Sequence, residues 1–335
     1  MNGNGARVRA SGAMIATIGS LLALAAADRV LGQAAAQTWP TKPIHIIVPF
    51  APGSATDIVA RTVFDHVSRQ VGQPIIIENR AGGGTTIGTG AVAKADPDGY
   101  TILVHSNGLV TTPAIQANVG YDPVADFSAI TPLGNLPLVL VISPDKNIRT
   151  LQELVAAAKA KPGSLNYAAA GIGTPPHLTM ERFRLAAGFE GQVVPFRGAP
   201  EALSEVMAGR VDVYFSPITP AMALIREGKL VALAVSSAKR SAALTNVPTT
   251  IESGYANSDF DFWVGMFAPK RTPRNVVNRI HQETVKGLED RAVYEKLANL
   301  GVEPMIMKPE DFDARVAKET RIAVELARAA NIPMQ

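Results

Sequence analysis

The chain has 335 residues, which is enough for two domains. Its 32 Lys and Arg against 29 Asp and Glu give a formal net charge of +3, which excludes a strongly basic nucleic-acid binder and an acidic disordered tail. It contains no cysteine, which excludes a disulfide scaffold, a thiol nucleophile, a cysteine-ligated zinc site and a lipid anchor on an N-terminal cysteine.

The N-terminus has the pattern of an export signal. Two arginines precede a nearly uncharged stretch over residues 10–27, and an A-x-A pattern follows. We expect a signal peptide of residues 1–36, cleaved after Ala36, although a cut after Ala27 also fits. This segment carries three Arg and one Asp, so its removal lowers the charge from +3 to about +1. The mature protein is expected to be soluble and exported, without a lipid anchor, and any selectivity for anions must come from local groups.

The mature chain alternates short apolar runs with amphipathic stretches, which predicts an α/β fold with mostly parallel strands. The first strand is expected at Ile44–Phe50, and a helix over 55–71 carries valines at i+4 spacing. A capping box, Thr150 with Glu153, opens another helix that Pro162 and Gly163 end. Strands are further predicted at 74–78, 100–105, 136–143, 165–169, 192–196, 211–215, 230–235 and 262–268, and helices at 175–187, 200–208, 217–227 and within 273–331.

The chain shows no internal repeat and no low-complexity linker. Two domains without a linker suggest that the chain crosses between them within extended segments, near 136–142 and 254–262. We therefore expect a discontinuous first domain, residues 37–138 plus 258–335, and a continuous second domain, residues 139–257. A cleft between two such domains is a usual place for a small-molecule site.

Four strand-to-helix junctions are rich in Gly, Ser, Thr and Pro. Each would present free backbone N–H groups at a helix N-terminus, where anions bind. An exposed helix dipole contributes only ~0.3–1 kcal/mol, whereas a micromolar ligand needs about 8 kcal/mol. Several junctions must therefore converge on one anion, and each junction alone is also compatible with ordinary helix capping. The junctions are Pro49–Asp57 with Ser54 as N-cap, Ala168–Pro175 with Thr174 as N-cap, Arg197–Pro200, and Ser216-Pro217.

Two charged residues at these junctions have two possible roles each. Asp57 lies three residues after Ser54, as in a capping box, and could cap its own helix or hold a water or a ligand amine. Arg197 could pair with a ligand carboxylate or with Glu201, one turn further along.

The familiar catalytic, nucleotide and metal motifs are missing from the sequence. The glycine-rich loop over 78–88 lacks the Gly-Lys-Ser/Thr ending of a phosphate loop, and Gly171-x-Gly173 lacks the third glycine of a dinucleotide fingerprint. Only His177 and Glu181 share a helical i, i+4 spacing, without a zinc-protease motif, and no Gly-x-Ser-x-Gly is present. We predict no cofactor, no metal and no catalytic residue.

A series of short motifs resembles the Bug-type solute receptors of tripartite tricarboxylate transporters, which are secreted proteins of Gram-negative bacteria. The order and spacing of the motifs, which span essentially the whole mature chain, carry the resemblance. They are Trp39–Ile44, Val48–Gly53 with Asp57, Ala60-Arg61, Glu78–Arg80, Asp96–Thr101, Ser106-Asn107, Asn166-Tyr167, Gly171–Thr174 with His177, Val194–Gly198 and Ala208–Asp212.

The resemblance implies a two-lobed, type II-like periplasmic binding fold that closes like a Venus flytrap on a small organic carboxylate between its lobes. It implies a non-enzymatic receptor, expected to be a monomer, with membrane transporter subunits and no nucleic acid as partners. This chain has Ser54 where the family commonly has a second glycine, so the identity of the ligand does not transfer. The binding residues implied are Phe50, Ser54, Ala55, Asp57, Ser106, Asn107, Ala170, Gly173 and Thr174, with Arg197, Gly198 and Ser216 as weaker candidates.

Two other functions stay open at this point. The same receptor could present its closed form to a membrane sensor, which makes it a signalling protein. It could also be an exported hydrolase that uses a serine or threonine with His177 or His105, although no nucleophile elbow is visible.

Overall fold

The structure is a computed structural model that describes residues 39–329, 332 and 334. From Lys42 onward the chain forms one compact unit, and the description below is of that unit. The predicted signal peptide, residues 1–36, and both of its cleavage positions lie outside the described residues. Among the described helices, none combines the length and the apolar character that crossing a bilayer requires.

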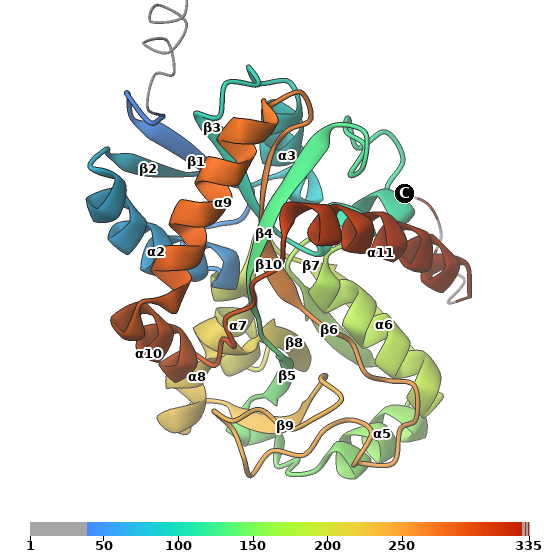
Figure 1. The fold of residues 1–335 in the computed structure, drawn as a ribbon. Helices are drawn as coiled ribbons and strands as arrows, with labels where there is room; N and C mark the ends of the chain where they lie inside the picture. Colours follow the sequence, from blue (N-terminus) through green and yellow to red (C-terminus); the bar gives the residue numbers. More distant parts are fainter. Residues whose placement is uncertain (1–38, 330–331, 333, 335) are drawn as a thin grey trace, which may run out of the picture. The chain divides into compact units, whose positions relative to one another are not determined.

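Ten strands form two five-stranded sheets in this part of the chain (Figure 1). The first sheet has the order β2-β1-β3-β10-β4 and the second the order β7-β6-β8-β5-β9. The first sheet consists of β1 (Ile44–Val48), β2 (Ile75–Asn79), β3 (Thr101–Ser106), β4 (Phe127–Asn135) and β10 (Trp263–Pro269). The second consists of β5 (Leu138–Ile142), β6 (Leu165–Ala169), β7 (Gly191–Pro195), β8 (Val213–Pro217) and β9 (Val231–Val235).

The expectation of mostly parallel strands is wrong in half of the pairings. β1 pairs in parallel with β2 and β3, and β6 with β7 and β8. By contrast, β10 lies antiparallel to β3 and β4, and β5 lies antiparallel to β8 and β9. The antiparallel strands flank the places where the chain passes from one sheet to the other, because β4 leads almost directly into β5 and β10 follows the return from β9. A strand that enters a sheet from the other sheet is not bound by the same-direction rule of a βαβ crossover.

Helices cover both faces of the first sheet. α2 and α9 pack on one face, and α3 and α11 cover the other, where the largest aromatic cluster lies. The short α4 contacts β3 and α11. The helices of this part are α2 (Ala55–Val71), α3 (Thr86–Ala93), α4 (Gly108–Thr111), α9 (Arg274–Glu289), α10 (Arg291–Asn299) and α11 (Pro309–Ala329).

The second sheet is covered in the same way. α6 packs on β6 and β8, and Phe183 of α6 meets Phe215 of β8 edge-on, with ring centroids 5.8 Å apart. α7 and α8 pack on β5 and β8, and α7 also contacts β6. The helices of this part are α5 (Leu151–Ala160), α6 (Pro175–Ala187), α7 (Ala199–Met207) and α8 (Ile218–Arg226).

The local sequence signals succeeded best where a cap fixes a helix end. The predicted helices 55–71 and 175–187 are confirmed as α2 and α6, and the capping box of Thr150 and Glu153 is present with both hydrogen bonds. The capping box expected at Ser54 is only half made, because the Asp57 carboxylate accepts the N–H of Gly53 rather than that of Ser54. The predicted strands lie within two residues of β1–β3 and β5–β10, but β4, α3 and α4 were missed.

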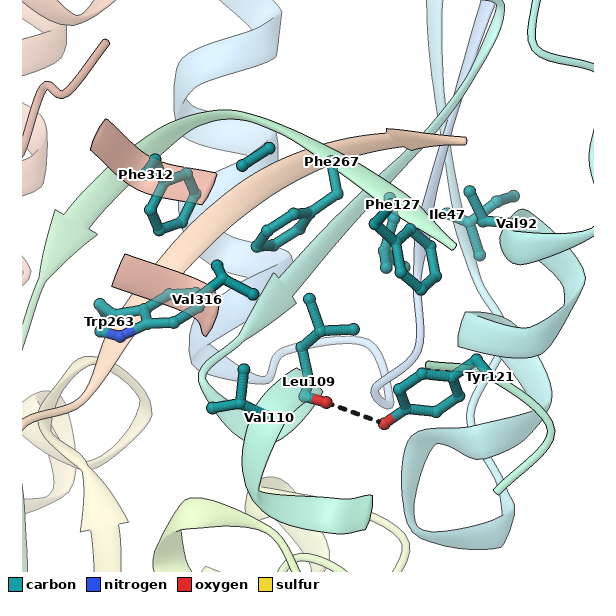
Figure 2. Close-up of a cluster of buried hydrophobic side chains, with 12 residues drawn as sticks. Ile47, Val92, Leu109, Val110, Tyr121, Phe127, Trp263, Phe267, Phe312 and Val316 are labelled. Carbon is teal, nitrogen blue, oxygen red and sulfur yellow. Dashed lines mark hydrogen bonds between the residues drawn. The ribbon is translucent and has the colours of Figure 1, made fainter. Parts of the chain in front are cut away.

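The core of the first sheet is built around aromatic rings from β10 and α11 (Figure 2). Phe312 of α11 lies against Trp263 and Phe267 of β10, with ring centroids 5.2 Å apart in both pairs. Gly265 lies between these two residues in the strand, and a Cβ there would come within 2.5 Å of the Phe312 ring. The glycine therefore lets α11 approach the sheet closely.

We predict that Gly265→Ala lowers the free energy of unfolding by about 1–3 kcal/mol, because the added methyl group forces the Phe312 ring out of a packed position. Urea denaturation measures this. Gly90→Ala in α3 is the matched control, since its Cβ would find only an ordinary contact, 3.7 Å from the Gly120 carbonyl oxygen. Because alanine favours a helix, this control should be neutral or more stable by up to about 1 kcal/mol. Equal stabilities of the two variants would contradict the packing argument.

Candidate binding site

Two cavities meet at the junctions that the sequence singled out, and Phe50 and Ala170 line both of them. The outer cavity has a volume of about 430 Å³. It is lined by Pro49, Phe50, Gly82, Gly83, Gly84, Thr85 and Gln116 from one side, and by Ala170, Gly171, Ile172, Pro195, Phe196, Arg197 and Glu201 from the other.

The inner cavity is small, about 20 Å³, and its lining is mostly apolar. The start of α2, which follows β1 of the first sheet, and the start of α6, which follows β6 of the second sheet, both line this cavity. Its lining residues are Phe50, Ser54, Ala55, Thr56, Ala170, Pro175, Pro176, Ala199, Tyr214, Pro217 and Phe262. The first two junctions of the sequence analysis therefore share one crevice.

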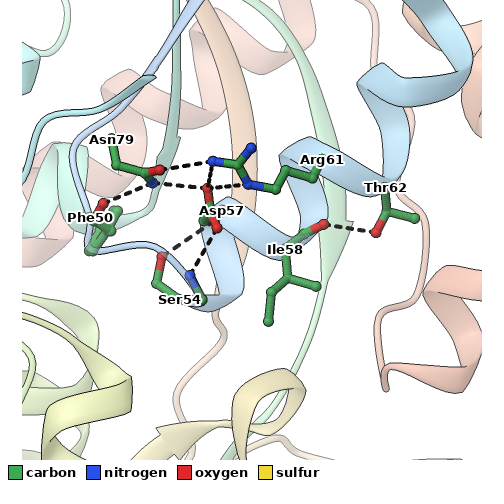
Figure 3. A network of polar contacts seen from close by, with 8 residues as sticks. Phe50, Ser54, Asp57, Ile58, Arg61, Thr62 and Asn79 are labelled. Atoms are coloured by element: carbon green, nitrogen blue, oxygen red, sulfur yellow. Dashed lines mark hydrogen bonds and ion pairs between the residues drawn. The ribbon is translucent and has the colours of Figure 1, made fainter. Parts of the chain in front are cut away.

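The junction after β1 is held by Asp57, whose carboxylate is buried (Figure 3). It accepts hydrogen bonds from the N–H of Gly53 at 2.9 Å, from Arg61 Nε at 3.0 Å and from Asn79 Nδ2 at 2.9 Å. Asn79 Nδ2 also donates to the Phe50 carbonyl oxygen at 3.1 Å. Asp57 is thus surrounded by the chain's own donors and lines neither cavity, which favours the capping role over contact with a ligand.

These donors decide the charge state of Asp57. Burial alone would raise the pKa of the carboxyl, but the hydrogen bonds from Arg61, the Gly53 N–H and Asn79 outweigh burial and hold the pKa below its ordinary value. The group is therefore ionised at neutral pH, and its charge fixes the turn that leads into α2.

The start of α2 has backbone N–H groups that are available as donors. Ser54 is the N-cap, and its Oγ accepts the Asp57 N–H at 3.4 Å. The N–H groups of Ala55 and Thr56, at the first two positions of the helix, have no acceptor among the described residues. Both residues are buried and line the inner cavity. Unpaired N–H groups of a first helical turn are suited to an anionic oxygen.

The start of α6 differs from the expectation that each junction presents free backbone N–H groups. Thr174 is the N-cap by position, but its Oγ1 donates to the Gly171 carbonyl oxygen at 2.7 Å instead of accepting from the helix. The first two helical residues are Pro175 and Pro176, which have no N–H to offer. The Gly173 N–H is also occupied, since it donates to His177 Nδ1 at 3.3 Å. The first two residues of this helix therefore shape the inner cavity without donating to it.

A buried polar network of β6 and α6 residues packs beside the junction at Ala168–Pro175. The His177 ring stacks on Tyr167 with centroids 6.4 Å apart, and the Tyr167 hydroxyl donates to Glu181. Arg184 Nη2 lies 2.7 Å from a Glu181 carboxylate oxygen. Burial raises the pKa of Glu181, but Arg184 and Tyr167 outweigh it and lower that pKa, while burial lowers the pKa of His177. The i, i+4 pair of His177 and Glu181 is thus part of the packing.

The remaining junctions contribute unequally. Arg197 is exposed at the outer cavity, and its backbone N–H, rather than its guanidinium, pairs with Glu201 Oε2 at 3.1 Å. Gly198 is the N-cap of α7. Ser216 is fully buried, donates to the Pro217 carbonyl oxygen at 2.9 Å and lines neither cavity. Of the weaker candidates, only Arg197 lines a cavity.

The predicted pair Ser106 and Asn107 lies away from both cavities. Ser106 Oγ is buried and accepts the Gly108 N–H at 3.1 Å. Asn107 Nδ2 donates to the Asp261 carbonyl oxygen at 2.9 Å, and Asn107 lines a different cavity, of about 200 Å³, beside α11. Asn107 thus holds the crossover segment before β10, and Ser106 bonds the backbone just after β3.

Several contacts bridge the segments on the two sides of the crevice. Thr111 Oγ1 donates to the Gly173 carbonyl oxygen at 2.9 Å, and Gln116 Nε2 donates to the Ile172 carbonyl oxygen at 2.8 Å. A Cβ on Gly198 would lie 2.9 Å from the Ala51 Cβ, so the start of α7 touches the first junction. These contacts hold the two sides of the crevice together.

One threonine and one histidine of the kind that a hydrolase would need lie close together. Thr85 lines the outer cavity, and its Oγ1 lies 3.2 Å from Nε2 of His105. Burial lowers the pKa of His105 to about 3, so the ring is a poor proton acceptor at neutral pH. The ring of His105 also meets Phe50 edge-on at 5.3 Å, which indicates that it supports the cavity wall.

Sequence reasoning missed four contributors to the two cavities. The glycine-rich loop, Gly82–Thr85, was examined only as a nucleotide motif, although it lines the outer cavity with Gln116. Tyr214 and Phe262 line the inner cavity. No local signal marks these last two, because an aromatic residue in an apolar strand is typical of a core.

Residues 59–331 match the family described as the tripartite tricarboxylate transporter family receptor, TctC. This match covers most of the chain. The chain belongs to this family. It is therefore a solute-binding receptor of the TctC family, which is a family of receptors rather than enzymes and works with tripartite transporters. The resemblance to Bug-type receptors is confirmed.

Known relatives agree in sequence and in fold. The protein BugT of Bordetella pertussis is 33% identical over 91% of this chain and 94% of its own length. A structure of the periplasmic binding protein BugD is 33% identical, with a TM-score of 0.85 over 89% of this chain and all of that one. R. palustris Rpa4515 with adipate is 29% identical, with a TM-score of 0.85 over 88% of this chain and 99% of that one. The TctC receptor thus has the two-lobed periplasmic binding fold.

We predict that Asp57→Asn lowers the free energy of unfolding of this TctC receptor by about 1–3 kcal/mol at neutral pH, because three donors lose a charged acceptor. Since the pKa of Asp57 is lowered in the folded protein, its contribution is present above the ordinary aspartate pKa and is lost as the pH falls through the folded-state pKa. The difference between wild type and variant should therefore shrink below about pH 4. Urea unfolding across this pH range measures it.

Asp65→Asn on the same helix is the matched control. Asp65 is exposed and pairs with Arg69 at 2.9 Å, an arrangement that contributes less than ~1 kcal/mol. Equal losses for the two variants, or a loss for Asp57→Asn that does not depend on pH, would contradict the role assigned to Asp57.

Proposed function

We propose that this receptor captures a small organic carboxylate in the crevice formed by the two cavities and delivers it to a tripartite tricarboxylate-type membrane transporter. The observation that carries this proposal is the pair of unpaired N–H groups of Ala55 and Thr56, buried at the inner cavity. An anionic oxygen suits them, and an ammonium group does not. The structure of a related R. palustris protein is known with adipate, a carboxylate.

The energetics favour several donors acting together. A charge-assisted hydrogen bond contributes about 1.5–3 kcal/mol, so two or three of them approach the roughly 8 kcal/mol of a micromolar complex. At the outer cavity, the exposed Arg197 is the basic side chain among the described lining residues. Arg197 lines the outer cavity with Glu201, whereas Ala55 lines the inner one, so Arg197 is suited to a second anionic group or to the approach of the ligand.

Closure of the two lobes around the ligand would distinguish the loaded receptor from the empty one for its membrane partner. The proposal divides the chain into lobes at residues 37–138 plus 258–335 and residues 139–257, and the two sheets follow the same division of strands. A carboxylate that touches α2 on one lobe and the segment at Ala170 on the other binds the closed form better than the open form. The membrane partner would then select the closed form, and no bond chemistry is involved.

The proposed setting is the periplasm. Export would follow from the predicted signal peptide, cleaved after Ala36, and the mature protein would act there as a monomer without a lipid anchor. The fold shared with the periplasmic binding protein BugD supports this localisation.

A melting series with carboxylates tests the ligand class. Acetate, succinate, adipate and benzoate should be compared with their uncharged amides at about 10 mM, because a ligand at 100 times its Kd adds about 2.7 kcal/mol of stability. We expect at least one carboxylate to raise the melting temperature and its amide to have a much smaller effect. If no carboxylate raises it, or if the amides act equally, the proposed function is wrong.

We predict that Gly198→Ala weakens binding of adipate, or of the panel carboxylate that stabilises best, at least ~10-fold, or about 1.4 kcal/mol. The added methyl group would meet Ala51 across the crevice and oppose closure. Gly198 has an extended backbone (φ 178°), so alanine introduces no local strain there. Calorimetric titration checks the affinity, and Gly90→Ala, away from the crevice, should bind like wild type. Unchanged affinity of Gly198→Ala would contradict closure at this contact.

A further inference from the structure

Tyr214 occupies an unusual position at the base of the crevice. Successive residues of a strand point to opposite faces. Its neighbour Phe215 packs on Phe183 of α6, so Tyr214 points to the face of the sheet that α7 and α8 cover. Tyr214 is fully buried and lines the inner cavity together with Ala55 and Thr56.

The Tyr214 hydroxyl has no hydrogen-bond partner among the described residues. The two other most deeply buried tyrosines differ in this respect. The Tyr121 hydroxyl donates to the Leu109 carbonyl oxygen at 3.2 Å, and the Tyr167 hydroxyl donates to Glu181. A buried polar group without a partner is costly, and Tyr214 also lines a cavity, so a partner from outside the chain would remove this cost.

The surroundings of this hydroxyl define what that partner is. Donors along the lining of the inner cavity include the Ala55 and Thr56 N–H groups, the Ser54 and Thr56 hydroxyls and the phenol itself, and the rest of the lining is largely apolar. A cavity of about 20 Å³ has room for an oxygen-sized group and little more. The partner must therefore bring a compact acceptor with several lone pairs, which is what a carboxylate oxygen offers.

We propose that the Tyr214 hydroxyl donates a hydrogen bond to a carboxylate oxygen of the bound ligand, together with the N–H groups of Ala55 and Thr56, and that it selects for this end group. The inference rests on the proposed function and names the residue of the second sheet that completes the binding site for the anion. Ligand binding removes the unsatisfied donor, so part of the binding free energy comes from a group that disfavours the empty closed form.

The phenol is suited to this role at any physiological pH. Burial raises the pKa of Tyr214, so the hydroxyl keeps its proton and stays a donor. Because it is neutral, it does not impose on the empty cavity the desolvation cost of a buried cation.

Tyr214→Phe tests the inference, since it removes one oxygen and keeps the ring. The probe is whichever of acetate, succinate, adipate and benzoate stabilises the wild type best, measured by calorimetric titration. We expect its Kd to rise at least ~10-fold, because the anion loses one donor. We also expect the melting temperature of the ligand-free protein to stay equal or rise by about 2 °C, because an unsatisfied buried hydroxyl is gone.

Tyr167→Phe is the matched control, since it removes a buried hydroxyl that has a partner. It should lower the melting temperature and change the Kd much less than Tyr214→Phe does. If Tyr214→Phe binds the probe like wild type, or if it loses stability as Tyr167→Phe does, the inference is wrong while the proposed function stands. If wild type binds none of the four carboxylates, the proposed function fails and this inference fails with it.

Discussion

The buried carboxylate of Asp57 is the interaction on which the crevice depends. It gathers the Gly53 N–H, Arg61 and Asn79 around one charge, and Asn79 in turn holds the Phe50 carbonyl oxygen. A buried charge is tolerated only when it is fully paired, so these donors and the turn between β1 and α2 fix one another. The same turn leaves the first two N–H groups of α2 without an acceptor among the described residues, in two buried residues that line the inner cavity.

The two sides of the crevice are not equivalent in chemistry. The α2 side offers backbone donors, whereas α6 begins with two prolines and uses its Gly173 N–H on His177. The second side instead contributes shape, supported by the buried network of Tyr167, Glu181 and Arg184, and the phenol of Tyr214. A ligand can touch the donors of the α2 side and the wall formed by the α6 side at the same time only when the two sides are close. Binding is therefore expected to favour the form in which they are close.

Passage of the chain between the sheets is what brings these surfaces together. β4 runs into β5 with only two residues between them, and the return before β10 is held by Asn107 and Ser236, which bond the backbone of Asp261 and Phe260. Short, hydrogen-bonded crossovers limit the ways in which one sheet can move relative to the other. Gly198 lies so close to Ala51 that a Cβ at residue 198 would come within 2.9 Å of the Ala51 Cβ, so a larger residue there would collide.

The sequence by itself determined the α/β class, the bounds of α2 and α6, the capping box at Thr150, the candidate junctions and, through the order of its motifs, the receptor family. These features depend on local hydrogen bonds and on spacing along the chain, which are written in consecutive residues. Only the tertiary structure decided that Asp57 is enclosed by its own donors, that Ser106, Asn107 and Ser216 lie outside the crevice, that half of the strand pairs are antiparallel and that Tyr214 reaches the inner cavity. Each of these depends on which residues distant in sequence are packed together, and a hydroxyl acquires or lacks a partner only when the whole chain has folded around it.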